Sequence, residues 1–225
     1  MSYYKVELLK RSLRKGLKTF LTQLFFMVRH YLSGRIYEKI YAIDCDKIKN
    51  DPRFGLEGLD CYTYKTWEEI PFEFRKIFDN KNESILFKTK SNLSKGWRVW
   101  LLTIDKNPAV VGYSYPGNVA HNFYFPMTDS SIYIHYIYTL PQYRGRGILP
   151  LLLKHMMYMS KTEGFERAFI IVDEYNISSI RSIEKAGFQP IGRGIINIHT
   201  GGKKWYPQNI PPLPSLITLK AIKTP

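Results

Sequence analysis

Apolar residues recur every three or four positions near the start of the chain, which is the spacing of one face of a helix. The residues on this spacing are Leu9, Leu13, Leu17, Phe20, Leu21, Leu24, Val28 and Leu32. The pair Ser33-Gly34 follows them directly and supplies a stop signal. The pattern therefore predicts an amphipathic helical arm over residues 1–35, followed by one domain over residues 36–225.

From Ile36 onward the pattern changes to short apolar runs separated by polar, glycine-containing or proline-containing segments. Runs rich in β-branched and aromatic residues predict strands at 36–43, 97–104, 109–115, 131–140, 167–172, 188–198 and 215–222. Helical spacing predicts helices at 66–78, 147–163 and 177–185. Antiparallel strands come first, and strands then alternate with helices. This order predicts an α/β fold with a mixed, mostly antiparallel sheet flanked by helices.

The composition is that of a folded domain with a strong basic excess. Apolar residues make up 44% of the 225 residues, which is enough for a sizeable core and excludes a mainly disordered chain. The net charge of +14 favours anionic partners such as nucleic acid, acidic membrane or phosphorylated ligands. Charge alone does not choose between them, and no recognised nucleic-acid motif is present, so nucleic acid is not expected as a partner.

Cysteine and histidine usage gives no sign of a metal site. Cys45 and Cys61 lie far apart and the five histidines are scattered, which excludes a disulfide-dense scaffold and a cysteine zinc site. No metal cofactor is expected, and a reducing compartment fits this usage. The longest apolar run, residues 24–28, is far shorter than the roughly 20 residues of a membrane span. We expect a cytoplasmic protein that is soluble or peripheral to a membrane.

The arm carries half of the net charge. Residues 1–35 contain eight basic residues and one acidic residue, a net charge of +7. Its apolar stripe has three interpretations: it packs on this domain, it packs on a second subunit in a homodimer, or it lies on an anionic membrane surface. Membrane binding normally needs more than one signal, so packing is the expectation at this stage.

A glycine-rich turn follows the most β-prone run of the chain. Residues 142–147 read Gln-Tyr-Arg-Gly-Arg-Gly and lead into the predicted helix at 147–163. Such a turn presents unsatisfied backbone N–H groups at a helix N-terminus, where anions are favoured. Gly145 and Gly147 remove side chains that would keep a diphosphate away, and Arg144 and Arg146 add charged donors. The turn predicts an anion site, but it lacks the Walker A and dinucleotide fingerprints.

Two segments resemble the signatures of the GNAT superfamily of N-acetyltransferases. Residues 139–148 are similar to its acyl-CoA pyrophosphate loop, whose pattern Gln142, Gly145 and Gly147 fill. Residues 176–188, Asn-Ile-Ser-Ser-Ile-Arg-Ser-Ile-Glu-Lys-Ala-Gly-Phe, are similar to its second signature, an Asn-initiated helix that closes in Lys-x-Gly-Phe. Both stand in the family's order and at its spacing. The resemblance covers residues 97–200 well, residues 36–96 loosely and residues 1–35 not at all.

The resemblance implies an acyl-CoA N-acyltransferase-like fold and acetyl-CoA as cosubstrate. It implies a diphosphate held by backbone N–H groups and a pantetheine or adenylate group near the second helix. The residues implied in cofactor binding are Ile137, Thr139, Gln142, Arg144, Gly145, Arg146, Gly147, Ile148, Asn176 and Ser179. The chain departs from the pattern at three places. Leu149 and Pro150 follow the loop, Ile183 replaces a proton-donating tyrosine, and residues 131–140 contain no acid.

The implied reaction needs a neutral amine, a polarised thioester carbonyl and good alignment. A backbone N–H near residues 137–139 is the expected oxyanion donor. The candidate bases are His135, Tyr136 and Asp173, and Tyr138 and Glu174 are further candidates. Strand alternation places Tyr133, His135, Ile137 and Thr139 on one face and Tyr136 and Tyr138 on the other. Structural roles remain open for all of them, as a satisfied strand histidine, core tyrosines or helix-capping acids.

The resemblance implies an enzyme that transfers an acetyl group from acyl-CoA to a primary amine of a small molecule, such as an amino sugar or a nucleotide sugar. Two alternatives stay open. The first is a non-catalytic module that binds or senses acyl-CoA, which fits the missing tyrosine and glutamate. The second is an acyltransferase that uses acyl carrier protein as donor, since acidic carrier helices would dock on a basic face.

Overall fold

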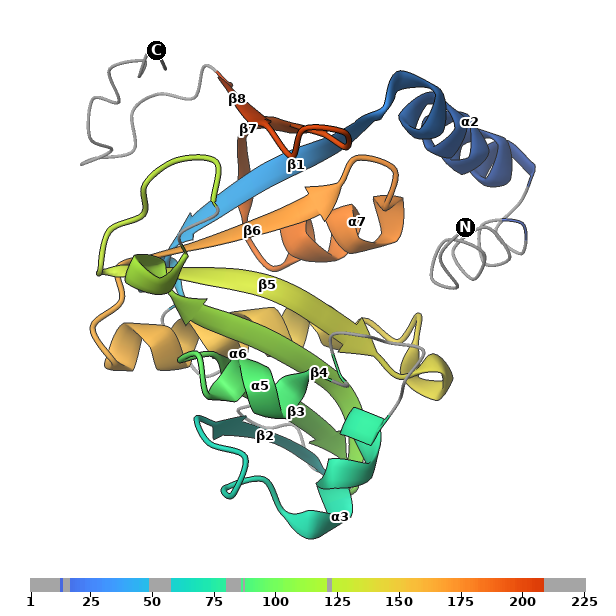
Figure 1. Ribbon diagram of the computed structural model, residues 1–225. Helices are drawn as coiled ribbons and strands as arrows, with labels where there is room; N and C mark the ends of the chain where they lie inside the picture. The colour runs from blue at the N-terminus through green and yellow to red at the C-terminus, as the bar shows by residue number, and fades with distance from the viewer. Residues whose placement is uncertain are drawn as a thin grey trace.

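One mixed sheet organises the molecule. The computed structural model describes residues 13, 17–48, 58–79, 86, 88–120 and 123–208. Within them, eight strands are ordered β2-β3-β4-β5-β6-β1-β7-β8, and β5 with β6 is the parallel pair while the others are antiparallel (Figure 1). The bounds are β1 Arg35–Asp44, β2 Leu59–Tyr64, β3 Arg98–Ile104, β4 Asn107–Pro116, β5 Ser131–Thr139, β6 Arg167–Asp173, β7 Gln189–Asn197 and β8 Lys203–Pro207. The predicted fold class, α/β with a mixed, mostly antiparallel sheet, is confirmed.

Two long helices cover one face of the sheet, which we call the back face. They are α6 (Ile148–Thr162) and α7 (Ile177–Lys185), both close to their predicted bounds. Apolar residues at helical spacing on α6 are fully buried against the sheet: Leu152, Leu153, Met156 and Met157. On the sheet side they meet residues such as Trp100, Val110 and Ile134. This burial holds α6 against the back face of the sheet.

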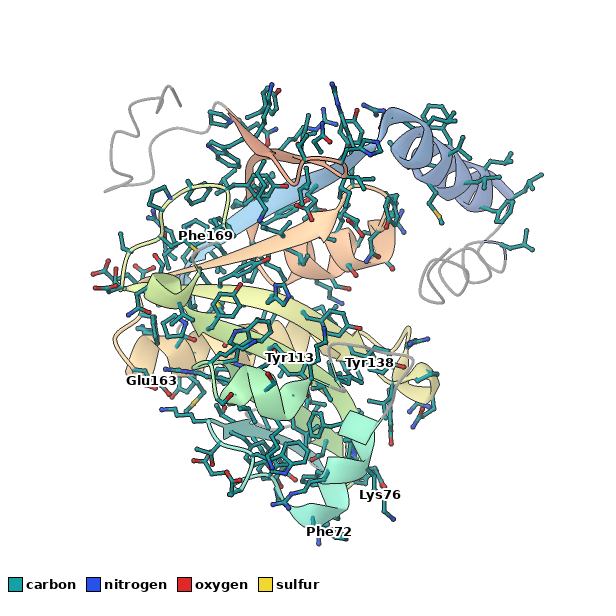
Figure 2. The ribbon with its side chains drawn as sticks, in the orientation of Figure 1. Phe72, Lys76, Tyr113, Tyr138, Glu163 and Phe169 are labelled. Carbon is teal, nitrogen blue, oxygen red and sulfur yellow. The ribbon has the colours of Figure 1, made fainter. Side chains whose placement is uncertain are left out.

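Shorter elements cover the opposite, front face. They are α3 (Phe72–Arg75), α5 (Thr89–Leu93), the 3₁₀ turns η2 (Lys76–Asp79) and η3 (Gly117–Val119), and the loop that leads from η3 to β5. Over β2 to β4 the front core contains Phe74, Leu93, Val99, Leu101 and Tyr113. Over β5, β6, β1 and β7 it contains an aromatic group: Phe123, Phe125, Tyr133, Phe169 and Trp205. Figure 2 shows Tyr113 and Phe169 on these two parts of the sheet.

A bulge in β5 changes the face on which its later residues lie. In the β4–β5 ladder Tyr113 pairs with Tyr136 and Ser114 with Ile134, so His135 is an extra residue. Beyond it the alternation is reversed: Tyr136 and Tyr138 pack on the front core, and Ile137 packs on the back core. The predicted grouping of His135 with Ile137 and Thr139 is therefore wrong, because a one-residue bulge shifts every later side chain to the other face.

The helical arm stands off the sheet. Its described part is α2 (Leu17–Ser33), which Figure 1 shows beside the start of β1, away from the rest of the sheet. On its inner side Met27 is buried against Tyr175, with Phe26 beside them. Leu17, Leu21, Val28 and Leu32 of the predicted stripe point to solvent, and Phe25 is exposed beside them. The structure shows no packing of these four stripe residues on the described part of the domain. Packing on a second subunit stays a prediction, as does the boundary between arm and domain at residue 35.

Three other differences have local causes. The helix predicted at 66–78 is confirmed only from Phe72 on, as α3 and the following 3₁₀ turn, because Oε2 of Glu69 accepts the N–H groups of Lys65 and Thr66 in a turn and the helix begins only after Pro71. The elements β2, α5 and β8 were not predicted. β8 is an edge strand that begins with two lysines, a composition that protects an edge but hides it from a hydrophobicity pattern. The strand predicted at 215–222 lies outside the described residues.

Candidate functional site

The turn between β5 and α6 is open to an anion. Gly145 and Gly147 have φ values of +82° and +73°, which L side chains rarely adopt, so glycine is required at both positions. A Cβ atom built on Gly145 would find no atom within 4 Å, so solvent or a ligand lies beside it. Gly147 is the N-cap of α6, and no side chain caps the helix there. The turn therefore leaves the N-terminus of α6 free for a ligand.

Backbone donors gather at this turn. In the described part of the chain, the N–H groups of residues 145–148 have no hydrogen-bond partner. Ile148 points its side chain into the back core, which fixes the position of its N–H at the start of the helix. Pro150 supplies no N–H, so the donors of residues 145–149 are the ones available. This set fits a diphosphate, because uncapped N–H groups at a helix N-terminus favour anions.

The charged side chains of the turn are arranged unequally. Nε of Arg144 donates to the carbonyl oxygen of Thr139 at 2.8 Å, and its guanidinium lies 5.4 Å from the Tyr138 ring. Arg144 therefore clamps the turn to the end of β5. Arg146 lies 5.4 Å from the ring of Tyr143 and is exposed, as is Gln142. Arg146 is the arginine better placed to meet a bound phosphate.

Lys185 adds a third positive charge to the turn, beside Arg144 and Arg146. A Cβ atom built on Gly147 would lie 4.0 Å from Nζ of this lysine, which ends α7. The sequence motif Lys-x-Gly-Phe at residues 185–188 thus brings an ammonium group to the glycine turn. Sequence analysis quoted this motif but did not assign the lysine a role. Its separation from Gly147 by almost forty residues hides the contact from a linear inspection.

Asn176 caps helix α7. Its Oδ1 accepts the N–H of Ser179 at 3.3 Å and the hydroxyl of Ser178 at 3.2 Å, and its side chain is buried. This is the N-cap arrangement that sequence analysis weighed against a cofactor contact. Binding of the cofactor by Asn176 and Ser179 stays a prediction. In the same helix Ile183 is buried in the back core, so no proton donor stands at that position.

We expect Asn176→Ala to lower the free energy of unfolding by about 1 kcal/mol, because two bonds to the cap oxygen are lost. For a chain of this size that corresponds to a fall in Tm of roughly 2–4 °C in a thermal melt. Asn176→Asp keeps an accepting oxygen and serves as the matched control. If the alanine variant also raised KM for acyl-CoA several-fold while the aspartate variant did not, the residue would contact the cosubstrate as well.

Strands β5 and β6 separate directly in front of the turn. They pair over residues 131–134 and 167–170, yet both continue, to Thr139 and Asp173. Among the described strands, none lies opposite the β6-facing edge of β5 beyond Ile134. Backbone groups alternate along a strand, so part of the N–H and C=O groups of residues 135–139 face this separation. It includes residues 137–139, where the oxyanion donor is expected, and that role stays a prediction.

His135 stands at the mouth of this separation. One side of its ring is exposed, while the rings of Trp97, Tyr115 and Tyr133 crowd the other at centroid distances of 4.9, 6.0 and 5.5 Å. Burial on that side lowers the pKa of the His135 imidazole, and the Lys203 ammonium lowers it further. A neutral imidazole at neutral pH can accept a proton. The burial of Tyr115 raises its pKa to about 12, so this hydroxyl stays protonated.

A pair of carboxylates lies on the same face. Glu38 of β1 is the direct Cα partner of Asp173 of β6, so their side chains leave the same face of the sheet. The hydroxyl of Tyr124 donates to Oε2 of Glu38 at 2.5 Å. Burial raises the pKa of the Glu38 carboxyl, and the Asp173 charge raises it further. The Tyr124 hydrogen bond and the Lys203 ammonium oppose both effects.

The carboxylate pair and His135 form one polar group on the front face. The charge of the Lys203 ammonium lowers the pKa of both Glu38 and His135. The charge of Glu38 raises the pKa of Tyr133, whose ring lies beside His135. The predicted candidates His135 and Asp173 thus lie on the same face of the sheet, on the two strands that flank the separation. Tyr136 is separated from them and packs in the front core near Tyr113. Glu174 is paired with Arg193 through both carboxylate oxygens at 2.7 Å.

Glu38 and Tyr124 were not predicted as site residues from the sequence. The signal for Glu38 was available, since it shares the strand period with the buried Ile40 and Ala42 and is an acid at an inward-facing position. Tyr124 lies in a loop, and Gly194 of β7 leaves room for its ring, because a Cβ atom there would lie 2.2 Å from Cζ of Tyr124. Among the described residues, no group of three or more His, Cys, Asp or Glu is placed to hold a metal ion.

Comparison with known families decides the relationship. Residues 62–188, more than half of the chain, match the model of the Acetyltransferase (GNAT) family. The chain belongs to the GNAT acetyltransferase family. In this family acetyl-CoA is the cosubstrate, and the matched segment contains both the glycine turn and helix α7. None of the curated protein sequences matches the chain.

Solved GNAT structures share the fold. An acetyltransferase of the GNAT family from Colwellia psychrerythraea superposes with a TM-score of 0.51 at 14% identity, over 71% of this chain and 55% of that one. A GCN5-related N-acetyltransferase from Sphaerobacter thermophilus gives a TM-score of 0.49 at 17% identity, over 74% and 53%. This GNAT chain therefore spans about half the length of these two proteins. The likeness bears on the fold alone.

Proposed function

We propose that this protein is an N-acetyltransferase that moves an acetyl group from acyl-CoA to the primary amine of a small molecule. One observation carries the proposal: the gap between β5 and β6 joins the anion-binding turn to the group of Glu38, Asp173 and His135. A phosphate site thus opens onto groups that can accept a proton. Acyl transfer to an amine requires this combination, since the donor carries a diphosphate and the acceptor must lose a proton.

The turn holds the donor. The uncapped N–H groups of residues 145–149 receive the diphosphate, and Arg146 and Lys185 neutralise its charge. Arg144 keeps the turn fixed against β5, so the donors are positioned before the ligand arrives. The pantetheine part of the acyl-CoA, beyond the diphosphate, enters the separation of β5 and β6. There the backbone groups of residues 135–139 that face the separation pair with its amides and polarise the thioester carbonyl.

Glu38 is the proposed general base. Its carboxylate is raised in pKa by burial, which brings it closer to the range in which a base works at neutral pH. The acceptor amine loses its proton to Glu38, directly or through one water, and its lone pair attacks the thioester carbon. The C–S bond then breaks and the CoA thiolate leaves. Ile183 cannot protonate that thiolate, so the leaving group takes its proton from solvent or from the acceptor nitrogen.

The same carboxylates select the acceptor. In a chain of net charge +14, Glu38 and Asp173 lie opposite each other on one face and attract the ammonium form of an amine. The half-exposed rings of Trp97 and Tyr115 provide a flat apolar wall beside His135. An amino sugar fits this combination, with its amine at the carboxylates and its ring along the wall. A nucleotide sugar would also use the basic surface.

The test is turnover with acetyl-CoA and a panel of primary amines that includes amino sugars, nucleotide sugars and acidic amines. We expect turnover with amines that carry no carboxylate near the nitrogen, because Glu38 and Asp173 repel one. Calorimetric binding of acetyl-CoA without turnover of any amine would overturn the proposal and make the chain a binding module. If only acyl carrier protein served as donor, the proposed donor would change from acyl-CoA to acyl carrier protein.

The pH profile reports on Glu38. We expect kcat/KM, referred to the neutral amine, to rise with pH along a limb that lies above the usual glutamate pKa of about 4.3, because burial raises this pKa. Asp173→Asn removes a charge that raises it, so the limb moves to lower pH in that variant. If the rise of kcat/KM with pH stayed at the same pH in Asp173→Asn and also persisted in Glu38→Gln, the titration would belong to a group other than Glu38. His135 would then be the first candidate.

A further inference from the structure

Exposed large apolar residues are concentrated in a stripe on α2. Its residues are Leu17, Leu21, Phe25, Val28 and Leu32, and their exposed fractions run from 47% at Val28 to 78% at Leu32. At 3.6 residues per turn these five positions fall within a sector of about 80° and extend about 22 Å along the helix. Apolar residues scattered singly are normal on a surface, whereas a continuous stripe marks an interaction site.

The domain does not cover this stripe. Met27 and Tyr175 bury the inner side of α2, while the stripe faces away from them. The helix is therefore anchored on one side and free on the other. Among the described helices none is long and apolar enough to cross a bilayer, so contact with a membrane would have to be along its surface.

The charge of the arm distinguishes the two remaining partners for the stripe, which are a second copy of this chain and an anionic lipid surface. Residues 1–35 carry a net charge of +7, and α2 itself contains Lys18 and Arg29 with no acidic residue. Packing two such arms against each other would bring like charges together, which opposes a homodimer through this stripe. An anionic lipid surface instead gains from every basic residue, by about 1 kcal/mol each near the surface. The structure adds that the stripe is exposed, so an available apolar surface joins the basic charge as the second signal that stable membrane binding requires.

We propose that α2 docks this protein on an anionic membrane surface, with the stripe inserted at the level of the headgroups. The proposal is independent of the catalytic proposal, because the stripe lies on a helix outside the group of Glu38, Asp173 and His135. Docking would hold the enzyme at the bilayer while its sheet remains in water. The occupant is the lipid headgroup layer, and neither a bilayer span nor a second subunit is required.

Vesicle sedimentation of the full chain tests this. We expect sedimentation with vesicles of phosphatidylcholine and phosphatidylserine at low salt, and little with phosphatidylcholine alone or at high salt, since screening weakens surface attraction. The triple variant L21E/F25E/L32E should lose sedimentation at least tenfold. Phe72→Glu is the matched control, because Phe72 is 76% exposed and lies on α3, far from α2 (Figure 2). It should sediment like the parent.

Folding and mass are measured on the same samples. The substituted residues are exposed, so we expect unchanged thermal melts and an unchanged molecular mass in light scattering. Parent protein that fails to sediment, or a triple variant that sediments like the parent, would overturn the proposal. A parent dimer that the triple variant converts to a monomer would also overturn it, because the stripe would then be a subunit interface.

Discussion

Replacing Gly145 by aspartate is expected to weaken acyl-CoA binding by about 100-fold or more. The new carboxylate would stand where a Cβ atom now meets nothing within 4 Å, beside the free N–H groups of residues 145–148. A negative charge facing the diphosphate costs several kcal/mol, and about 2.7 kcal/mol corresponds to a 100-fold change in Kd. Calorimetric titration with CoA measures the loss.

Backbone strain must be separated from charge in this experiment. Gly145 has a φ of +82°, so any L residue there is strained. Gly201→Asp is the matched control, since Gly201 has a φ of +68°, also meets nothing within 4 Å, and lies in the turn between β7 and β8. The control should bind CoA as the parent does. Unchanged CoA binding in Gly145→Asp would show that the diphosphate lies elsewhere.

Replacing Glu38 by glutamine is expected to lower kcat/KM by about 100-fold, the smaller end of the range for losing a general base. Glutamine keeps an oxygen that can accept the Tyr124 hydroxyl, so the packing survives while the proton acceptor is lost. Glu184→Gln is the matched control. Its carboxylate also accepts a tyrosine hydroxyl, that of Tyr41 at 2.9 Å, but it belongs to α7 on the back face.

Stability gives an independent measurement for the same variant. The pKa of Glu38 is higher in the folded than in the unfolded chain, so the folded state binds the proton more tightly. The free energy of unfolding therefore falls as pH rises from the ordinary glutamate pKa through the raised value. Glu38→Gln removes this fall, and we expect its Tm at neutral pH to equal or exceed that of the parent. A marked loss of Tm together with activity would indicate a structural role instead.

The sequence predicts the back half of the molecule better than the front. Helices α6 and α7 and strands β5 and β6 follow regular periods with clear caps and stops, and their bounds differ from the prediction by one or two residues. The short elements α3, α5 and β8 depend on tertiary contacts and edge position, which leave no period in the sequence. The helix predicted at 66–78 is accordingly too long, since only its second half, from Phe72, is helical.

Site residues were predictable where a motif is local. The turn at residues 142–148 is continuous in sequence, so its glycines and arginines were identified together. Glu38, Tyr124 and Asp173 come from β1, a loop and β6, and only the sheet register brings them to one face. The bulge at His135 is equally invisible, because one unpaired residue in a strand has no signature in a run of β-prone residues.

The short pairing of β5 with β6 divides the sheet into two half-sheets, β2 to β5 and β6 to β8 with β1. In the sheet itself only the four pairs from Ser131–Arg167 to Ile134–Ile170 connect them, and the packing of α6 and α7 supplies the rest. An acyl-CoA molecule bound between the two half-sheets would contact both of them and would connect β5 to β6 where their pairing has ended. Ligand binding would then add to cooperativity as well as to stability, because two units that can open separately would be obliged to unfold together.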